Sequence, residues 1–245
     1  MVSIDKKYRV VRTLISKRPR ENSFLVALIG TLLMFVVSLY AWQDDGSFMN
    51  ALKGDSDAVL GEGQVYRLFT AILIHAHLKH LISNAIFFLF FSYLLYGYYG
   101  FWVYPILCFL MGGAVNYLTL LTYPEGISII GASGVVYLMA GFWFAGYMYI
   151  ERSRPVSRRI LHVLGVSLLL LIPSAVNPEV SYSSHFIGFL LGITSGIVYL
   201  IRNRDEIRDK EVRVFDEEGE AYTHGFENRE SHAGNSEDDD DPWVM

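Results

Sequence analysis

Long stretches without a charged residue constrain this chain more than any other feature. From His80 to Pro124 no Asp, Glu, Lys or Arg occurs, and further uncharged stretches cover residues 24–42, 126–150, 160–178 and 180–201. About 20 apolar residues in a helix cross the roughly 30 Å hydrocarbon core of a bilayer. Only 18% of the residues are charged, whereas soluble domains carry about 25%. The pattern therefore predicts a polytopic membrane protein.

The number of predicted spans is six. The stretch from 80 to 124 is too long for one helix, and it divides at Gly97-Tyr98-Tyr99-Gly100 into two helices joined by a turn. The first stretch, Phe24 to Trp42, exceeds the apolar region of a signal peptide and no small-residue cleavage site follows it, so we interpret it as a span. The expected fold is an all-α bundle of six transmembrane helices.

Lysine and arginine residues outside the spans predict the orientation, because positively charged loops stay on the cytoplasmic side. They are concentrated before the first span, between the fourth and fifth spans, and after the last span, whereas residues 123–130 and 174–183 contain none. We therefore expect both termini in the cytoplasm and the bundle in a plasma (inner) membrane. The basic residues are Lys6, Lys7, Arg9, Arg12, Lys17, Arg18, Arg20, Arg152, Arg154, Arg158, Arg159, Arg202, Arg204, Arg208 and Lys210.

Composition divides the chain into a basic arm at 1–23, the helical domain at 24–202 and a tail at 203–245. Residues 216–245 hold eleven Asp or Glu against Arg229 alone, a net charge of −10 in a chain whose total is −5. Such a segment has too little apolar surface to order itself, so we predict a disordered cytoplasmic tail. A partner-binding or regulatory tail is the alternative.

Metal and cofactor chemistry finds no support in the sequence. Cys108 is the only cysteine and lies in the third predicted span, where packing is its expected role. No Cys/His cluster, phosphate-binding loop, nucleotide fingerprint or internal repeat occurs. We expect no metal, no cofactor and no nucleic-acid partner.

Polar side chains inside the predicted spans are candidates for function, because burying them in hydrocarbon is costly. One group lies where the second span begins, one residue begins the fourth span between glycines, and another lies near the start of the sixth. In the six-span topology all three positions fall at the external end of the bundle. The residues are His75, His77, His80, Asn84, Ser133 and His185.

Ser133 and His185 have the chemistry of a nucleophile and its base. A serine attacks poorly until a base removes its proton, and histidine titrates near working pH. No Asp or Glu lies beside them in the spans, so a dyad is predicted in place of a triad. Tyr137, one turn after Ser133, is expected to pack against the imidazole. His80, Asn84 and backbone N–H groups at the helix start are candidate oxyanion donors.

Glycines in the same two spans predict that these helices approach each other closely. His185, Gly188 and Gly192 form one stripe on the sixth span, and Gly131 and Gly134 flank Ser133 on the fourth. Small residues let membrane helices pack at short distance. The fourth and sixth spans are therefore predicted to touch.

These motifs resemble those of the rhomboid intramembrane serine proteases. The resemblance covers roughly residues 20 to 202 and includes the family's GxSG nucleophile motif with its following tyrosine, its final-helix histidine motif and its second-helix pattern of histidines and asparagine. The matching residues are Gly131, Ala132, Ser133, Gly134 and Tyr137; Ser184, His185, Gly188 and Gly192; and His75, His80 and Asn84.

The resemblance implies cleavage of single-span membrane proteins near their external boundary, with Asn84 and His80 lining the oxyanion site. It also implies that the loop at 42–79 lies partly in the outer leaflet. The chain departs from the family's pattern at Tyr66, where tryptophan often precedes the arginine, and at Ser184, where alanine commonly precedes the histidine. Neither departure touches the reacting groups.

Two non-enzymatic classes compete with this interpretation. A rhomboid-like pseudoprotease would bind transmembrane helices without cutting them, but Ser133 and His185 are both present. A small transporter would usually carry intramembrane charges or inverted repeats, and neither occurs. His77 and His162 are interpreted as structural or interfacial. The expected partners are the lipid bilayer and single-span membrane protein substrates.

Overall fold

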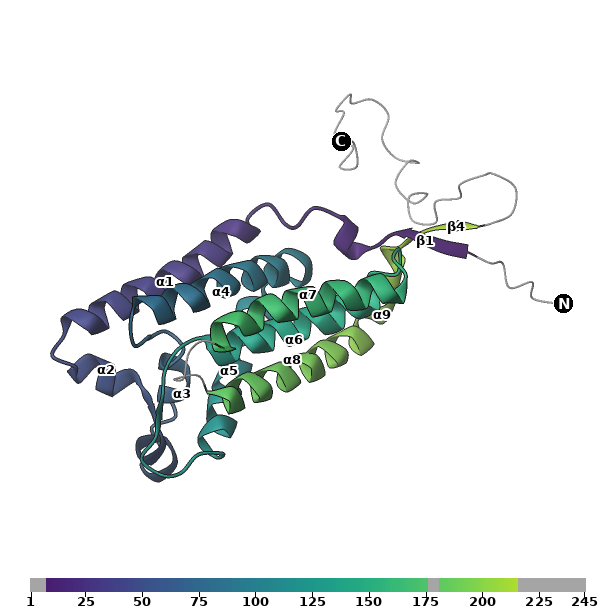
Figure 1. Cartoon of the computed structure of the whole chain (residues 1–245). Coiled ribbons are helices and arrows are strands. Elements are labelled where there is room, and N and C mark those ends of the chain that lie inside the picture. Colours follow the sequence, from purple (N-terminus) through teal and green to yellow (C-terminus); the bar gives the residue numbers. More distant parts are fainter. Residues whose placement is uncertain (1–7, 176–180, 216–245) are drawn as a thin grey trace.

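The structure, a computed structural model, describes residues 8–175 and 181–215, and helices make up most of it (Figure 1). Short strands form two separate two-stranded sheets. The helices are α1 (Ser23–Gln43), α2 (Ser47–Leu52), α3 (Arg67–Thr70), α4 (Leu78–Tyr99), α5 (Cys108–Leu120), α6 (Ser133–Ile150), α7 (Val156–Ala175), α8 (Tyr182–Arg202) and α9 (Arg204–Asp209). The strands are β1 (Tyr8–Arg12), β2 (Gly54–Asp55), β3 (Ser128–Ile129) and β4 (Val212–Phe215), and single helical turns cover 14–16, 57–61 and 102–107.

The long helices follow the predicted spans. Among the described residues, five helices are long and apolar enough to cross a membrane: α1, α4, the segment Trp102–Leu120, α6 and α8. The all-α, polytopic membrane fold is therefore confirmed. The fifth predicted span corresponds to α7, whose 20 residues would extend about 30 Å. Because α7 begins at Val156 and carries Arg158 and Arg159 in its first turn, its crossing of the bilayer stays a prediction.

The start of the fourth span differs from the expectation. The uncharged stretch begins at Gly126, but α6 begins only at Ser133. Residues 126–132 instead form an extended segment that includes β3, and β3 pairs with β2 from the loop after α2. The hydropathy of the sequence does not reveal where the helix begins, because a buried loop can have the same amino-acid composition as a helix. The consequence is that Ser133 stands at a helix start, directly after a loop.

The helix α6 lies at the centre of the bundle. In the 18-residue apolar stretch of α6, 67% of the residues are buried, compared with 28% in the corresponding stretch of α1 at the periphery. A helix that is apolar all round is stable only when neighbours cover every face. Side chains of Leu138, Met139 and Phe142 are buried almost completely, with α4, α5 and α8 packed around them.

Glycines bring α6 and α8 into backbone contact. A Cβ at Gly188 would overlap the carbonyl oxygen of Gly134, and one at Gly192 would overlap that of Leu138. A side chain at either position would push the helices apart. The close contact predicted from the glycine stripe is confirmed, and it fixes the distance between the helices that carry Ser133 and His185.

The two ends of the described chain meet beyond the last helix. Strand β1 pairs antiparallel with β4 (Figure 1). Beside them Glu211, whose side chain is 2% exposed, pairs with Arg152 at 3.3 Å and Arg213 at 3.0 Å. Residues 203–215 were predicted to belong to a disordered tail, but they form α9 and β4 and pack against the bundle. The acidic segment 216–245 lies outside the described residues.

Candidate active site

A cavity of about 250 Å³ opens where α4, α6 and α8 begin. These helices run in the same direction, so their first turns lie at one end of the bundle, opposite to β1 and β4 (Figure 1). Five of the predicted site residues contribute to the lining, together with Gly131. They are His80, Asn84, Ser133, Tyr137 and His185.

Ser133 is the first residue of α6 and follows a sharp turn. Gly131 has a φ of +104°, which residues with a side chain rarely adopt, and its N–H donates to the carbonyl of Ala71 at 2.8 Å. A Cβ at Gly131 would lie 2.8 Å from the His80 ring. The position therefore requires glycine for its backbone angle and for the approach of His80.

His185 stacks on Tyr137. The ring centroids are 4.0 Å apart and the planes differ by 14°. The hydroxyl of Tyr137 donates to the carbonyl of Leu170 on α7 at 3.3 Å, which fixes the orientation of the tyrosine ring. The packing of Tyr137 against the imidazole, expected from the one-turn spacing, is confirmed. The aromatic face limits rotation of the imidazole, a constraint that an acidic residue imposes in a triad.

Asn84 brings a buried amide to the cavity. It is 7% exposed, and its Nδ2 has no hydrogen-bond acceptor among the described residues. An unsatisfied buried donor is costly, so such groups commonly serve a ligand or a reacting atom. The Nδ2 lies 3.5 Å from the position of a Cβ on Gly131, next to the start of α6.

His75 lies behind the cavity and connects α1 to the turn before Ser133. Its Nε2 accepts from the N–H of Ala132 at 3.3 Å, so the ring proton is on Nδ1, which lies 3.2 Å from the Oγ of Ser38. The indole of Trp42 donates to the His75 carbonyl at 2.7 Å. Burial, with a smaller effect of nearby His80, lowers the pKa of His75 to about 3, so the ring stays neutral.

Two further histidines of the described residues, His77 and His162, do not line the cavity. His77 is the N-cap of α4, because its Nδ1 accepts from the N–H of His80 at 3.1 Å. His162 is exposed on α7, and its Nδ1 lies 2.7 Å from the carbonyl of Arg158.

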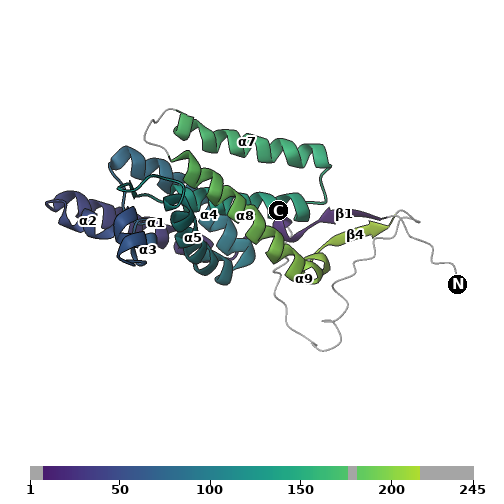
Figure 2. The ribbon, with the colours of Figure 1, turned by 90° about the horizontal axis from the view of Figure 1, so that it is seen from below.

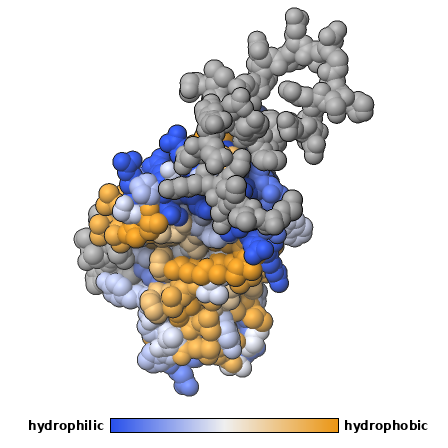
Figure 3. All heavy atoms as spheres, turned by 90° about the vertical axis from the view of Figure 1, so that its right-hand side faces the viewer, coloured by the Kyte–Doolittle hydropathy of each residue, from blue (hydrophilic) through white to orange (hydrophobic). Residues whose placement is uncertain are grey.

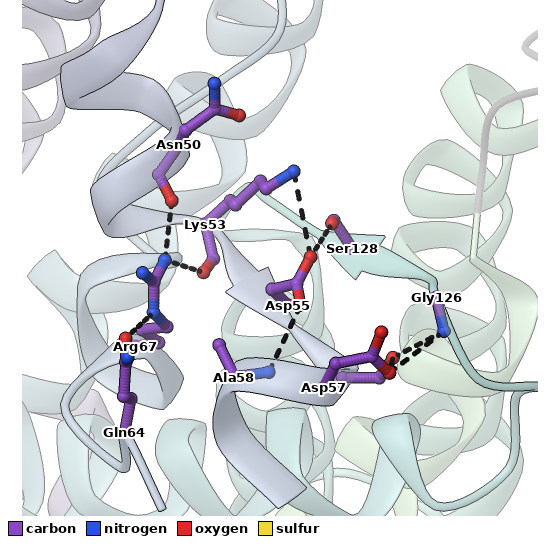
Figure 4. Close-up of polar contacts among 10 residues, drawn as sticks. Asn50, Lys53, Asp55, Asp57, Ala58, Gln64, Arg67, Gly126 and Ser128 are labelled. Carbon is purple, nitrogen blue, oxygen red and sulfur yellow. Dashed lines mark hydrogen bonds and ion pairs between the residues drawn. The ribbon is translucent and has the colours of Figure 1, made fainter. Parts of the chain in front are cut away.

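Arg67 organises the loop between α1 and α4. Its Nε donates to Gln64 Oε1 at 2.6 Å, and its Nη1 donates to the carbonyls of Asn50 and Lys53 (Figure 4). The guanidinium also lies 5.5 Å from the ring centre of Tyr66. A tyrosine therefore serves as the aromatic neighbour of this arginine, where the family often has tryptophan.

A second set of contacts holds the segment before Ser133. Asp55 Oδ2 accepts from the hydroxyl of Ser128 at 2.8 Å, and the N–H of Gly126 donates to Ser56 and Asp57 (Figure 4). The Ser128 hydroxyl and the N–H of Ala58 lower the pKa of the Asp55 carboxyl, so it remains ionised. Sequence reasoning missed these residues, since their partners lie about 70 positions away.

A metal centre is not apparent in the part of the chain that the structure describes. No group of three or more His, Cys, Asp or Glu side chains there is placed to hold a metal ion.

Comparison with known proteins agrees with the motifs. The family model of the Rhomboid domain matches residues 62–202, which is more than half of the chain. RHOMBOID-like protein 1 of Arabidopsis thaliana is 29% identical over 150 residues, which cover 60% of this chain and 38% of that protein. The chain thus matches well under half of the length of this relative. It is a multi-pass membrane protein that belongs to the rhomboid family.

Proposed function

We propose that this protein is an intramembrane serine endopeptidase that cleaves transmembrane segments of other membrane proteins. The observation that carries the proposal is the shared cavity, in which a hydroxyl, an imidazole and an amide from three helices meet. Ser133 is the nucleophile and His185 its base. The family relationship supports the same reaction class.

The reaction follows from the roles of these two groups. His185 takes the proton of Ser133 as its Oγ attacks the scissile carbonyl carbon, and a tetrahedral intermediate forms. The imidazolium then gives that proton to the leaving nitrogen, and the C–N bond breaks to leave an acyl-enzyme. Water, deprotonated by His185, hydrolyses this ester and regenerates the serine. Tyr137 holds the imidazole plane throughout.

The oxyanion of the intermediate needs hydrogen-bond donors that are already in place. The Nδ2 of Asn84 is one, because it is buried beside the cavity without an acceptor among the described residues. The N–H of Ser133 is another, since the first residue of a helix has no intrahelical acceptor. His80, in van der Waals reach of Gly131, is the third. His75 is a positioning residue that acts through the backbone of Ala132.

The substrates we propose are single-span membrane proteins with small or helix-breaking residues near the external boundary. In a helix each peptide N–H is bonded to the carbonyl four residues earlier, so the scissile segment must unwind before Ser133 reaches it. Polar groups of Ser83, Asn116 and Ser181 also line the cavity and give water a place beside Ser133. The orientation we propose has both termini in the cytoplasm of a plasma (inner) membrane.

Covalent labelling tests the nucleophile directly. We expect a fluorophosphonate probe to label the purified full-length protein and to leave Ser133→Ala unlabelled, because only an activated serine attacks phosphorus. The matched control is Ser92→Ala, a buried serine that bonds its own helix at Phe88. Equal labelling of wild type and Ser133→Ala would remove this serine from the mechanism. A folded wild type that never labels would favour the non-catalytic, helix-binding alternative.

We expect Asn84→Ala to lower kcat by about 10² to 10³, since that is the usual effect of removing one oxyanion donor. KM should change little, because the oxyanion forms only in the transition state. Steady-state cleavage of a single-span substrate in proteoliposomes measures both constants. Asn22→Ala is the matched control, an amide that bonds Tyr96 away from the cavity. An Asn84→Ala protein with wild-type kcat would exclude Asn84 as a donor.

A further inference from the structure

A second hollow lies at the opposite end of the bundle from Ser133. It is an apolar groove of about 750 Å³ between α6, α7 and α8. Phe144 and Met148 of α6, Val163 of α7, and Ile193 and Ile197 of α8 line it. Figure 2 shows α7 standing apart from α8, and α6 packs extensively against α8 but only lightly against α7. No other described element fills the space between these helix faces.

Arginine side chains surround one end of the groove. Arg204 and Arg208 of α9 line it directly. Arg159 donates to the carbonyl of Met148, a lining residue, while its buried Nε has no acceptor among the described residues. Among the described residues, the carboxylate that pairs with these arginines is that of Asp205, 3.1 Å from Arg204, and both partners are well exposed, which makes the pair weak.

The position of this end matches a membrane interface. Hydrophilic residues gather in the upper part of the face in Figure 3, on the side of β1 and α9, and hydrophobic surface lies directly below them. An amphiphile in the groove would have its apolar part beside α6 and α8 and its polar part at the arginines. The loop that carries Arg152 and Arg154 lies at the same end, as does the first turn of α7 with Arg158, and the distribution of basic residues predicts this end to be cytoplasmic.

We propose that this groove binds an anionic glycerophospholipid of the cytoplasmic leaflet. An acyl chain occupies the apolar part, and the phosphate is held by Arg204 and Arg208, because guanidinium groups match phosphate with paired hydrogen bonds. Basic pockets between transmembrane helices are typical sites for such head groups. The volume of about 750 Å³ falls within the roughly 300 to 1,000 Å³ of ligand sites.

The proposed lipid would also contact α7, the helix that contributes Leu170 to the cavity of Ser133. Val163 and Leu170 are two turns apart on one face of α7. Val163 lines the groove, whereas Leu170 lines the cavity of Ser133 and accepts the hydrogen bond of Tyr137. The binding proposal does not depend on proteolysis and is tested without it.

Lipid binding to the delipidated full-length protein in detergent provides the test, read by native mass spectrometry. The probes are phosphatidylglycerol, phosphatidylcholine and inorganic phosphate. The variants are Arg204→Gln/Arg208→Gln, which removes the phosphate ligands, and Ile197→Trp, which fills the apolar part without altering charge. Arg202→Gln is the matched control, because Arg202 is exposed at the end of α8 and does not line the groove. Thermal unfolding of each variant identifies any that fail to fold.

We expect phosphatidylglycerol to bind at least about tenfold more tightly than phosphatidylcholine, the double arginine variant to lose this preference, and Ile197→Trp to weaken both lipids. Arg202→Gln should retain wild-type binding. Equal affinity for the two lipids, equal loss in the double variant and in Arg202→Gln, or binding of inorganic phosphate alone would each overturn the proposal. Occupation of the groove by a second copy of the chain, seen as a dimer that excludes lipid, would also overturn it.

Discussion

Ser133→Ala is expected to lower kcat/KM for a single-span membrane substrate by at least about 10⁴-fold, because removing a serine nucleophile leaves only substrate binding and the oxyanion donors. The methyl group fits the space of the CH₂OH group, so the bundle should fold normally. Cleavage in proteoliposomes, followed as product against time, measures the loss, and thermal unfolding of the variant should match that of wild type.

The control for Ser133→Ala is Ser92→Ala, which removes a hydroxyl from the interior of α4. Its cleavage rate should stay within a fewfold of wild type. If Ser133→Ala were to cut the same bond within about tenfold of the wild-type rate, another nucleophile would be at work. The proposed reaction would then have to be abandoned, although the family and the fold would stand.

His185→Ala is expected to be nearly as damaging, because loss of the base costs about as much as loss of the nucleophile when both act as one unit. The stacked face of Tyr137 loses its partner, but the glycine contact between α6 and α8 does not involve this side chain. We therefore expect a folded protein without measurable proteolysis. The same variant should also fail to react with a fluorophosphonate, since Ser133 is no longer activated.

His162→Ala serves as the control for that result, as it removes an exposed histidine of α7 that does not line the cavity. It should retain cleavage and labelling. Substantial cleavage by His185→Ala would mean that a different group accepts the proton of Ser133. His80, which lines the same cavity, would be the first alternative to examine.

Much of the fold followed from charge and hydropathy. A bilayer admits only segments that satisfy their own backbone hydrogen bonds, so a long uncharged stretch must be a helix, and its length sets the number of crossings. The helices α1, α4 and α8 begin and end close to the predicted bounds for this reason. The beginning of α6 and the structure of residues 203–215 did not follow, because both depend on strand partners elsewhere in the chain.

The sequence predicted which residues form the candidate site, but not which other residues hold them in place through hydrogen bonds. The order of the motifs along the chain predicted Ser133, His185 and Asn84 as site residues. Helix periodicity predicted that Tyr137 packs beside the imidazole. The chain of contacts through His75 to Ser38 and Trp42 was not predictable, since those residues look like ordinary span positions. The bonds of Asp55 and Asp57 to the segment before Ser133 join residues with no shared local pattern.

The sequence by itself determined which segments enter the membrane and which polar groups enter with them, because the energetic cost of each group there depends on its own chemistry. The tertiary structure decided which of these groups face one another. Contacts between distant helices depend on how the helices pack. Packing brings the backbone of Gly134 against Gly188 and buries the Asn84 amide without an acceptor among the described residues. It also places α7 so that a groove remains beside Arg204 and Arg208.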